Sequence, residues 1–139
     1  MAMKSSVIPG LRYADPEAAI AWLRANFGFA EQGIFRDDDG KIVHAQLVHG
    51  GGMIMLGPDS NPNMRDTVGT PDRFGGKSSQ AIYVVVDDAD AHHARALAGG
   101  AQILKPLEDA DYGGRGYTCR DTDGHVWEFG TYDPWVTQS

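Results

Sequence analysis

Glu128 is the acidic side chain best placed for chemistry in the last apolar segment of the chain. It stands between Trp127 and Phe129, so strand alternation predicts that its carboxylate lies on the face opposite the two aromatic rings. A carboxylate in apolar surroundings has a raised pKa unless it is paired. Glu128 is therefore expected either to hold a ligand ammonium group or hydrogen-bond donor, or to form a buried salt bridge, for example with Arg12 or Arg115.

A glycine-rich segment, residues 111–117, carries aromatic and cationic side chains. Tyr112 offers a stacking and hydrogen-bonding surface, and Arg115 offers a fixed fork of donors. Its three glycines allow the backbone to approach a ligand closely. The segment is interpreted either as a loop that closes on a ligand or as an exposed connection in which Arg115 pairs with Asp111 or Asp121.

The histidines do not form chelating pairs by their spacing. His44 and His49 lie five positions apart on a predicted strand, so they point to opposite faces. His92 and His93 are neighbours on a predicted helix and diverge by about 100°. We expect these two to lie on a solvated helix face. His44 is the histidine expected to line a binding surface.

The composition narrows the class of protein. A chain of 139 residues and 15.0 kDa fits one domain. The formal net charge of −7 argues against a broad basic face for nucleic acid. The single cysteine, Cys119, excludes an internal disulfide framework and a cysteine-rich zinc site. Apolar stretches are too short to span a membrane, and the N-terminus lacks a signal-peptide core, so a cytoplasmic protein is expected.

Two helices and two groups of strands must position these side chains. Asp15-Pro16 and Gly28 are typical helix boundaries and predict a helix that ends at Phe27. A second helix is predicted over residues 89–98. The predicted strands cover residues 7–13, 29–36, 41–49, 53–56, 80–86, 102–107, 117–120 and 125–131.

The two halves of the chain repeat the same order of elements. Asp15 and Asp87 lie 72 positions apart, as do Leu56 and Glu128. Each half reads as a strand, a helix and three strands. The order of elements, and the glycines that recur at corresponding boundaries between them, indicate an internal repeat. The predicted fold is α+β, with two βαβββ modules in one chain.

Five segments carry a family resemblance: residues 11–15, 26–29, 86–90, 99–101 and 121–129. They resemble the vicinal-oxygen-chelate superfamily, in its branch of glyoxalases and bleomycin-resistance proteins. The resemblance implies the glyoxalase/bleomycin-resistance fold, in which the modules form a curved mixed sheet with a ligand-binding cup.

The implied organisation is a single domain over residues 1–139. Its first module covers about residues 5–57 and its second residues 80–133. A proline- and glycine-rich linker, residues 58–79, joins them. The resemblance also implies a homodimer, with modules that can be exchanged through the linker.

Metal-using members of the superfamily carry ligands on the first and last strand of each module. The matching positions here are Ile8 and Leu56 in the first module, and Glu128 with either Gln80 or Ala81 in the second. A catalytic divalent ion commonly takes about three protein ligands and a water. Only Glu128 is a good ligand, so we expect no metal and no cofactor.

The function implied is metal-free binding of a small organic ligand, aromatic or cationic, as in drug sequestration and antibiotic resistance. Tyr83 joins the site if Ala81 rather than Gln80 faces the cup. The expected ligand-binding residues are His44, Leu56, Tyr83, Tyr112, Arg115 and Glu128. The alternatives are a metal-dependent lyase or dioxygenase with shifted ligands such as His44 and Glu128, and a metal-free enzyme in which Glu128 acts as acid or base; catalytic residues are not assigned.

Overall fold

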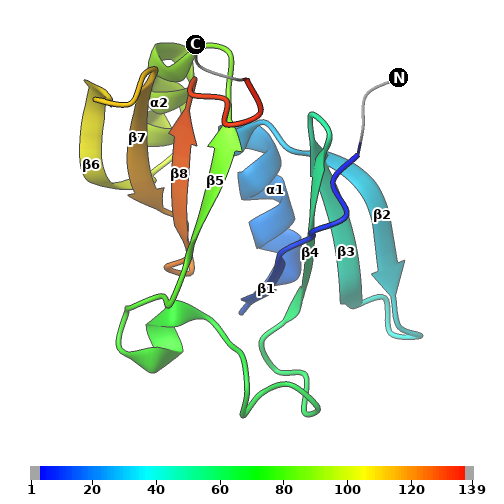
Figure 1. Ribbon diagram of the computed structural model, residues 1–139. Helices are drawn as coiled ribbons and strands as arrows, with labels where there is room; N and C mark the ends of the chain where they lie inside the picture. The colour runs from blue at the N-terminus through cyan, green and yellow to red at the C-terminus, as the bar shows by residue number, and fades with distance from the viewer. Residues whose placement is uncertain (1–3, 137–139) are drawn as a thin grey trace. The chain divides into compact units, whose positions relative to one another are not determined.

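The computed structural model describes residues 4–136, which form two compact units. Unit 1 ends at Lys77 and unit 2 begins at Ser78. Each unit has a four-stranded mixed sheet and one α-helix, in the order strand, helix and three strands (Figure 1). The two predicted βαβββ modules are confirmed. Residues 58–77, part of the expected linker, cluster with unit 1.

The sheet of unit 1 has the strand order β1-β4-β3-β2. Strand β1 pairs with β4 in parallel, and the other neighbours are antiparallel. The elements are β1 (Gly10–Tyr13), α1 (Pro16–Phe27), β2 (Ala30–Arg36), β3 (Ile42–His49) and β4 (Gly52–Pro58).

Helix α1 begins and ends where the local sequence predicts. The Asp15 carboxylate accepts a hydrogen bond from the Ala18 backbone N–H at 3.2 Å, which satisfies one of the free amides of the first turn. Pro16 occupies the first helical position, where its missing N–H costs nothing. Gly28 ends the helix with a φ of 83°, a left-handed conformation that favours glycine.

The sheet of unit 2 has the matching strand order β5-β8-β7-β6. Helix α2 packs against β6, β7 and β8 and covers one face of this sheet (Figure 1). The opposite face, which points away from α2, is called the far face below. The elements are β5 (Ala81–Val85), α2 (Ala89–Ala98), β6 (Gln102–Asp109), β7 (Arg115–Arg120) and β8 (Val126–Gly130).

Helix α2 corrects the register of the internal repeat. Its N-cap is Asp88, whose carboxylate accepts from the Ala91 N–H at 3.0 Å, and not Asp87. The spacing between the two caps is therefore 73 positions. At this spacing Leu56 matches Phe129, and both are buried, with 2% and 1% exposure. Met55, not Leu56, is the counterpart of Glu128.

The core of each unit lies between its helix and its sheet. In unit 1 the fully buried side chains include Tyr13, Leu23 and Phe27. In unit 2 they include Trp127 and Phe129, at 0% and 1% exposure. Because side chains alternate along a strand, this burial directs Glu128 to the far face, as strand alternation predicted.

Residues 58–77 contain a defined cluster around Arg73. Its guanidinium lies 2.5 Å from the Asp59 carboxylate, which is 8% exposed, and it donates to the Arg65 carbonyl at 3.1 Å. A short 3₁₀ helix, η1 (Pro71–Phe74), carries the arginine. These contacts tie the beginning of the segment to its end. Among the helices of residues 4–136, none is long and apolar enough to cross a membrane.

Candidate functional site

A row of paired residues crosses the far face of unit 2. Tyr83 on β5 lies opposite Glu128 on β8, and Glu128 lies opposite Thr118 on β7. Thr118 in turn lies opposite Lys105 on β6. Directly opposed residues on neighbouring strands bring their side chains within contact distance. The sheet register therefore gathers an aromatic ring, a carboxylate, a hydroxyl and an ammonium group in one line.

The neighbouring row is hollow because it contains two glycines. Gly116 on β7 pairs directly with Gly130 on β8. A Cβ at Gly116 would lie 2.6 Å from the Phe129 carbonyl oxygen, and a Cβ at Gly130 would lie 2.8 Å from the Tyr83 hydroxyl. Side chains at these positions would displace the backbone or the tyrosine. The glycine pair leaves room beside the row of paired residues.

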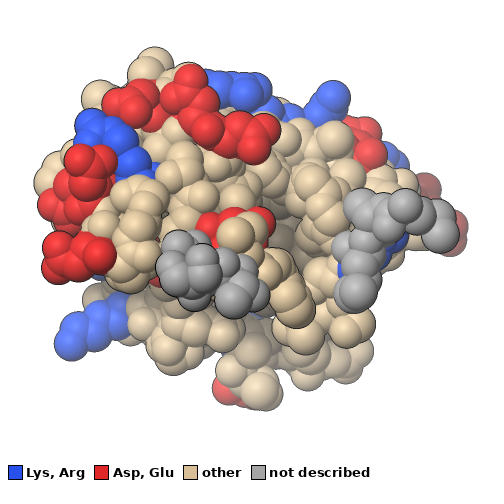
Figure 2. Space-filling model, turned by 45° about the horizontal axis from the view of Figure 1, so that its top comes forward, with Lys and Arg blue, Asp and Glu red and all other residues tan. Residues whose placement is uncertain are grey.

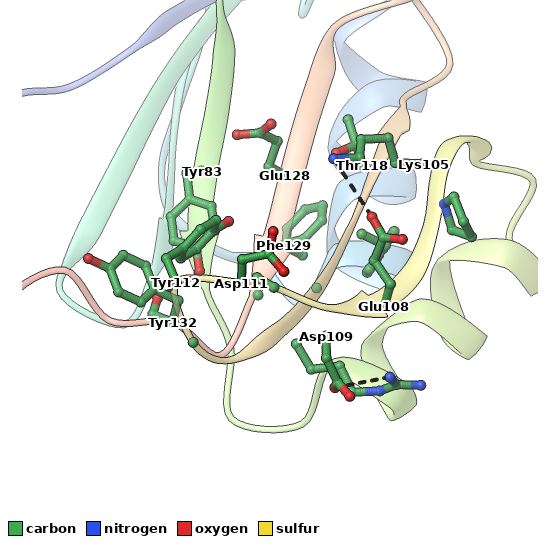
Figure 3. A pocket seen from close by; sticks show the side chains of 17 residues that line it. Tyr83, Lys105, Glu108, Asp109, Asp111, Tyr112, Thr118, Glu128, Phe129 and Tyr132 are labelled. Atoms are coloured by element: carbon green, nitrogen blue, oxygen red, sulfur yellow. Dashed lines mark hydrogen bonds and ion pairs between the residues drawn. The ribbon is translucent and has the colours of Figure 1, made fainter.

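A pocket of about 340 Å³ occupies this region of unit 2. This volume lies at the lower end of the roughly 300–1,000 Å³ typical of small-molecule sites. Figure 3 shows three tyrosines on one side of the pocket and Glu108, Lys105 and Thr118 on the other. The lining residues are Tyr83, Lys105, Pro106, Glu108, Asp109, Ala110, Asp111, Tyr112, Gly113, Arg115, Gly116, Tyr117, Thr118, Glu128, Phe129, Gly130 and Tyr132.

The three tyrosines hold one another in place. The Tyr83 hydroxyl donates to the Tyr132 carbonyl at 2.6 Å. The Tyr112 and Tyr132 rings meet edge to face, with centroids 4.9 Å apart. Burial raises the pKa of Tyr83, and the nearby Tyr112 and Glu128 raise it further. The Tyr83 phenol therefore stays protonated at neutral pH and remains a hydrogen-bond donor.

The charged groups of the pocket are mostly acidic. Lys105 lies 3.7 Å from Glu108, and the Arg115 guanidinium lies 3.2 Å from Asp109. Four carboxylates and two cations line the pocket, which leaves a formal excess of two negative charges. Figure 2 shows acidic side chains, with basic ones between them, at the left of the view.

Glu128 is the acid of the paired row, and it is exposed on the far face. Among residues 4–136 it has no ion-pair partner within the structure. The alternative of a salt bridge between Glu128 and Arg115 is therefore wrong. The carboxylate lies at the pocket wall beside Tyr83 (Figure 3).

Arg115 is bound by aspartates other than those expected. Its guanidinium pairs with Asp90 at 3.2 Å and with Asp109 at 3.2 Å, not with Asp111 or Asp121. The hydrogen bonds to Asp90, and then to Asp109, raise its pKa. Arg115 lies an even number of positions from the buried residues of β7, so it is on the same face of the sheet as they are. Its side chain therefore extends toward the N-terminus of α2. It lines the pocket margin but does not offer a free guanidinium.

Two expected site residues, Leu56 and His44, belong to unit 1 and are not among the residues that line this pocket. Leu56 is buried in the core and is not on an accessible face, so its expected place in the site is wrong. The internal repeat was aligned with an error of one residue, and a shift of one position exchanges the two faces of a strand. His44 Nε2 lies 3.0 Å from the Gln46 side-chain oxygen, and Gln46 donates to Gln32 at 2.5 Å. His44 therefore takes part in a polar chain on its own sheet.

The two histidines of α2 are not on a solvated face. His92 Nδ1 lies 2.6 Å from the Tyr117 hydroxyl, and its ring centroid lies 4.1 Å from that of Phe129. His93 meets the Tyr117 ring edge to face at 4.9 Å. The large apolar side chains that would normally fill this interface are missing from α2, where Ala89 and Ala96 are the buried residues, so the imidazoles pack against the sheet instead.

The sequence interpretation missed several pocket residues, of which Tyr132 is the most informative. Strands β7 and β8 are antiparallel, so the start of β7 and the end of β8 meet at one edge. The predicted hairpin therefore already implied that Tyr132, which follows β8, lies beside Tyr112, which precedes β7. Other lining residues that were missed include Lys105, Glu108 and Asp109, which lie on the edge strand β6.

Potential metal ligands are scattered over both units. In the part of the chain that the structure describes, no three His, Cys, Asp or Glu side chains lie close enough together to hold a metal ion. His44 lies in unit 1 and Glu128 in unit 2, and each has different neighbours within its unit.

Comparison with known proteins identifies relatives over almost the whole chain. An uncharacterized protein of Mycobacterium bovis, Mb0911c, is 33% identical over 128 residues, which are 92% of this chain and 84% of that protein. The uncharacterized protein Rv0887c of Mycobacterium tuberculosis is also 33% identical over 128 residues, which are 92% of this chain and 75% of that protein.

Solved structures share the fold. TioX from Micromonospora sp. ML1 is 36% identical with a TM-score of 0.71, covering 97% of this chain and 100% of that one. TnmS3, an antibiotic binding protein from Streptomyces sp. CB03234, is 20% identical with a TM-score of 0.66, covering 94% and 97%. A family model matches residues 7–129, and with the two βαβββ modules it shows that this chain belongs to the Glyoxalase/Bleomycin resistance protein/Dioxygenase superfamily.

Proposed function

We propose that this protein binds a small, aromatic and cationic organic molecule in the pocket of unit 2, without using a metal. The observation that carries the proposal is the combination of Tyr83, Tyr112 and Tyr132 with an acid excess in one pocket. The tyrosines provide ring faces and edges, and Glu128 provides an acceptor that forms no ion pair within residues 4–136.

The chemistry of the lining supports this ligand class. A cation within about 6 Å of a tyrosine ring is attracted by its quadrupole. A ligand ammonium group between Tyr83 and Glu128 would combine this attraction with a charge-assisted hydrogen bond. An anionic ligand would meet the repulsion of the surplus carboxylates. The net charge of −7 also favours the approach of cations.

Sequestration is the role that requires least of these residues. TnmS3 shares the fold and is an antibiotic binding protein, so the fold itself accommodates binding of this kind. We propose that the chain acts in the cytoplasm as a homodimer that binds its ligand without converting it.

Tryptamine, an aromatic amine, is the probe for the test. Calorimetric titration should show that tryptamine binds more tightly than indole-3-propionate, the matched anion. Glu128→Gln should weaken tryptamine binding by roughly 1 kcal/mol, about fivefold, because an exposed carboxylate is screened by water. Tyr112→Ala should weaken it by a similar amount through the loss of an aromatic contact, about 0.5–1.5 kcal/mol.

The control is Glu31→Gln, which removes the same charge from an exposed carboxylate in unit 1. Its tryptamine affinity should equal that of the wild type. Equal losses in Glu31→Gln and Glu128→Gln would show that only net charge matters, and the proposed site would be wrong. Binding that ignores both Glu128→Gln and Tyr112→Ala would place the ligand elsewhere.

A further inference from the structure

Arg120 is a half-buried arginine whose side chain has no hydrogen-bond or ion-pair partner among residues 4–136. It is the last residue of β7, and the alternation that buries Tyr117 and Cys119 beneath α2 directs Arg120 to the far face. Its Nε is inaccessible to solvent and has no hydrogen-bond partner. Within residues 4–136, its side chain also forms no ion pair.

This arrangement is unusual in an acidic protein. The exposed arginines Arg24, Arg36 and Arg115 each pair with a carboxylate. A guanidinium is charged at every physiological pH. Buried polar groups are nearly always hydrogen-bonded, and an unsatisfied one is costly when the group is charged. The charge of the Arg120 guanidinium is therefore left without a counter-ion by residues 4–136.

Arg120 lies one step from the proposed ligand site. It pairs with Val126 on β8, two residues before Glu128 on the same face. Such diagonal neighbours lie about 7–8 Å apart. The side chains of Arg120 and Glu128 have opposite charges, yet they do not pair with each other. The far face thus presents a cation and an anion on neighbouring strands, and neither forms an ion pair within the described part of the chain.

We propose that Arg120 binds a carboxylate of the ligand while Glu128 binds its ammonium group. The ligand class is then the aromatic zwitterion, namely an aromatic amino acid or a compound that retains its amino and carboxyl groups. The inference rests on the proposed function, because the ring and the ammonium group occupy the tyrosine and Glu128 site. It adds a second charge that the lining of the pocket alone does not reveal.

The geometry of a guanidinium suits a carboxylate. The two terminal Nη groups donate side by side, so they match the two oxygens of a carboxylate in a bidentate pair. A ligand carboxylate at the Nη groups would bring the negative charge that the site lacks around Arg120. A ligand with an amide in its place would offer the guanidinium only a weaker, neutral acceptor.

Tryptophan and tryptophanamide form the matched pair of probes, because they share the ring and the ammonium group and differ in the carboxylate. Titrations at about pH 6 keep both amines protonated. The wild type should bind tryptophan about tenfold more tightly than tryptophanamide, the gain of one hydrogen-bonded charge pair. Arg120→Gln should abolish this preference and leave the affinity for tryptophanamide unchanged, which also shows that the variant is folded.

Two further variants complete the test. Arg120→Lys keeps the charge but loses the bidentate fork, so it should retain only part of the preference. Arg65→Gln removes the same charge from an exposed arginine of unit 1 and should retain all of it.

The outcomes separate the inference from the proposed function. If the wild type shows no preference, or if Arg120→Gln keeps it, Arg120 does not bind a carboxylate, whereas Glu128-dependent binding of tryptamine would still support the proposed function. If tryptophan binding depends on Arg120 while tryptamine does not bind, the carboxylate site stands and the proposed cation site is wrong. If no probe binds, both are wrong.

Discussion

The hydrogen bond between His92 and Tyr117 should couple helix α2 energetically to its sheet. His92 Nδ1 lies 2.6 Å from the hydroxyl oxygen of Tyr117, whose side chain is 4% exposed. Burial raises the pKa of Tyr117, so the phenol is neutral near neutral pH and can donate to the imidazole. The informative perturbation is a double-mutant cycle with His92→Phe and Tyr117→Phe.

The magnitudes follow from the burial of the two partners. His92→Phe keeps a ring against Phe129 but leaves the buried Tyr117 hydroxyl without its imidazole, which should cost about 1–3 kcal/mol. Tyr117→Phe leaves an imidazole nitrogen that is only half-buried, so it should cost less, about 0.5–1.5 kcal/mol. The double variant removes both polar groups together. It should be more stable than the sum of the single losses predicts, by about 1 kcal/mol.

The assay is urea denaturation followed by circular dichroism at about pH 8, where an unperturbed imidazole is neutral. His93→Phe combined with Tyr117→Phe is the control cycle, because His93 meets the Tyr117 ring edge to face and the two side chains share no hydrogen bond. Its coupling should be smaller. If the losses of His92→Phe and Tyr117→Phe add to within about 0.3–0.5 kcal/mol, the hydrogen bond contributes nothing specific and the reasoning is refuted.

Four further outcomes are expected. Burial raises the pKa of the Cys119 thiol from 9.0 to about 12. As pH rises, the unfolded chain therefore loses this proton before the folded chain does. The free energy of unfolding should fall as pH rises between these two values. The fall should amount to about 1.4 kcal/mol per pH unit for one proton, and Cys119→Ala should flatten it in denaturation curves. Asp59→Asn weakens the pair with Arg73 and should speed tryptic cleavage within residues 58–77, while Glu31→Gln should not; equal cleavage rates would show that the pair does not hold the segment. Light scattering at micromolar concentration should give the mass of a homodimer, and a monomer mass would contradict that expectation. Protein purified without added ions should contain no stoichiometric transition metal by elemental analysis, and a chelator should leave its thermal midpoint unchanged; one tightly bound ion per chain would support a metal-dependent enzyme.

The sequence by itself determined the elements and their order. Asp15, Pro16 and Gly28 specify the ends of α1 through backbone hydrogen bonds and φ angles, which depend on neighbours only a few positions away. The strands follow from alternation in the same local way. Alternation predicted that Glu128 lies on the face opposite Trp127 and Phe129, and the burial of both rings makes this the far face.

The faces of the remaining strands needed more than local information. The choice between Asp87 and Asp88 as the cap of α2 is a difference of one position, which neither side chain decides by its type. Because side chains alternate along a strand, an alignment of the two halves that is wrong by one position assigns each strand residue to the wrong face of its sheet. Leu56 was therefore expected at an accessible site, although it lies in the core.

Only the tertiary structure decided which charges meet and which do not. Arg115 pairs with Asp90 and Asp109, residues that α2 and the bulged strand β6 bring to it from positions 25 and 6 residues away. The pocket exists because Gly116 and Gly130 fall opposite each other in the ladder. Such pairings are set by sheet register and helix packing, which act between residues distant in sequence and leave no local periodicity to read.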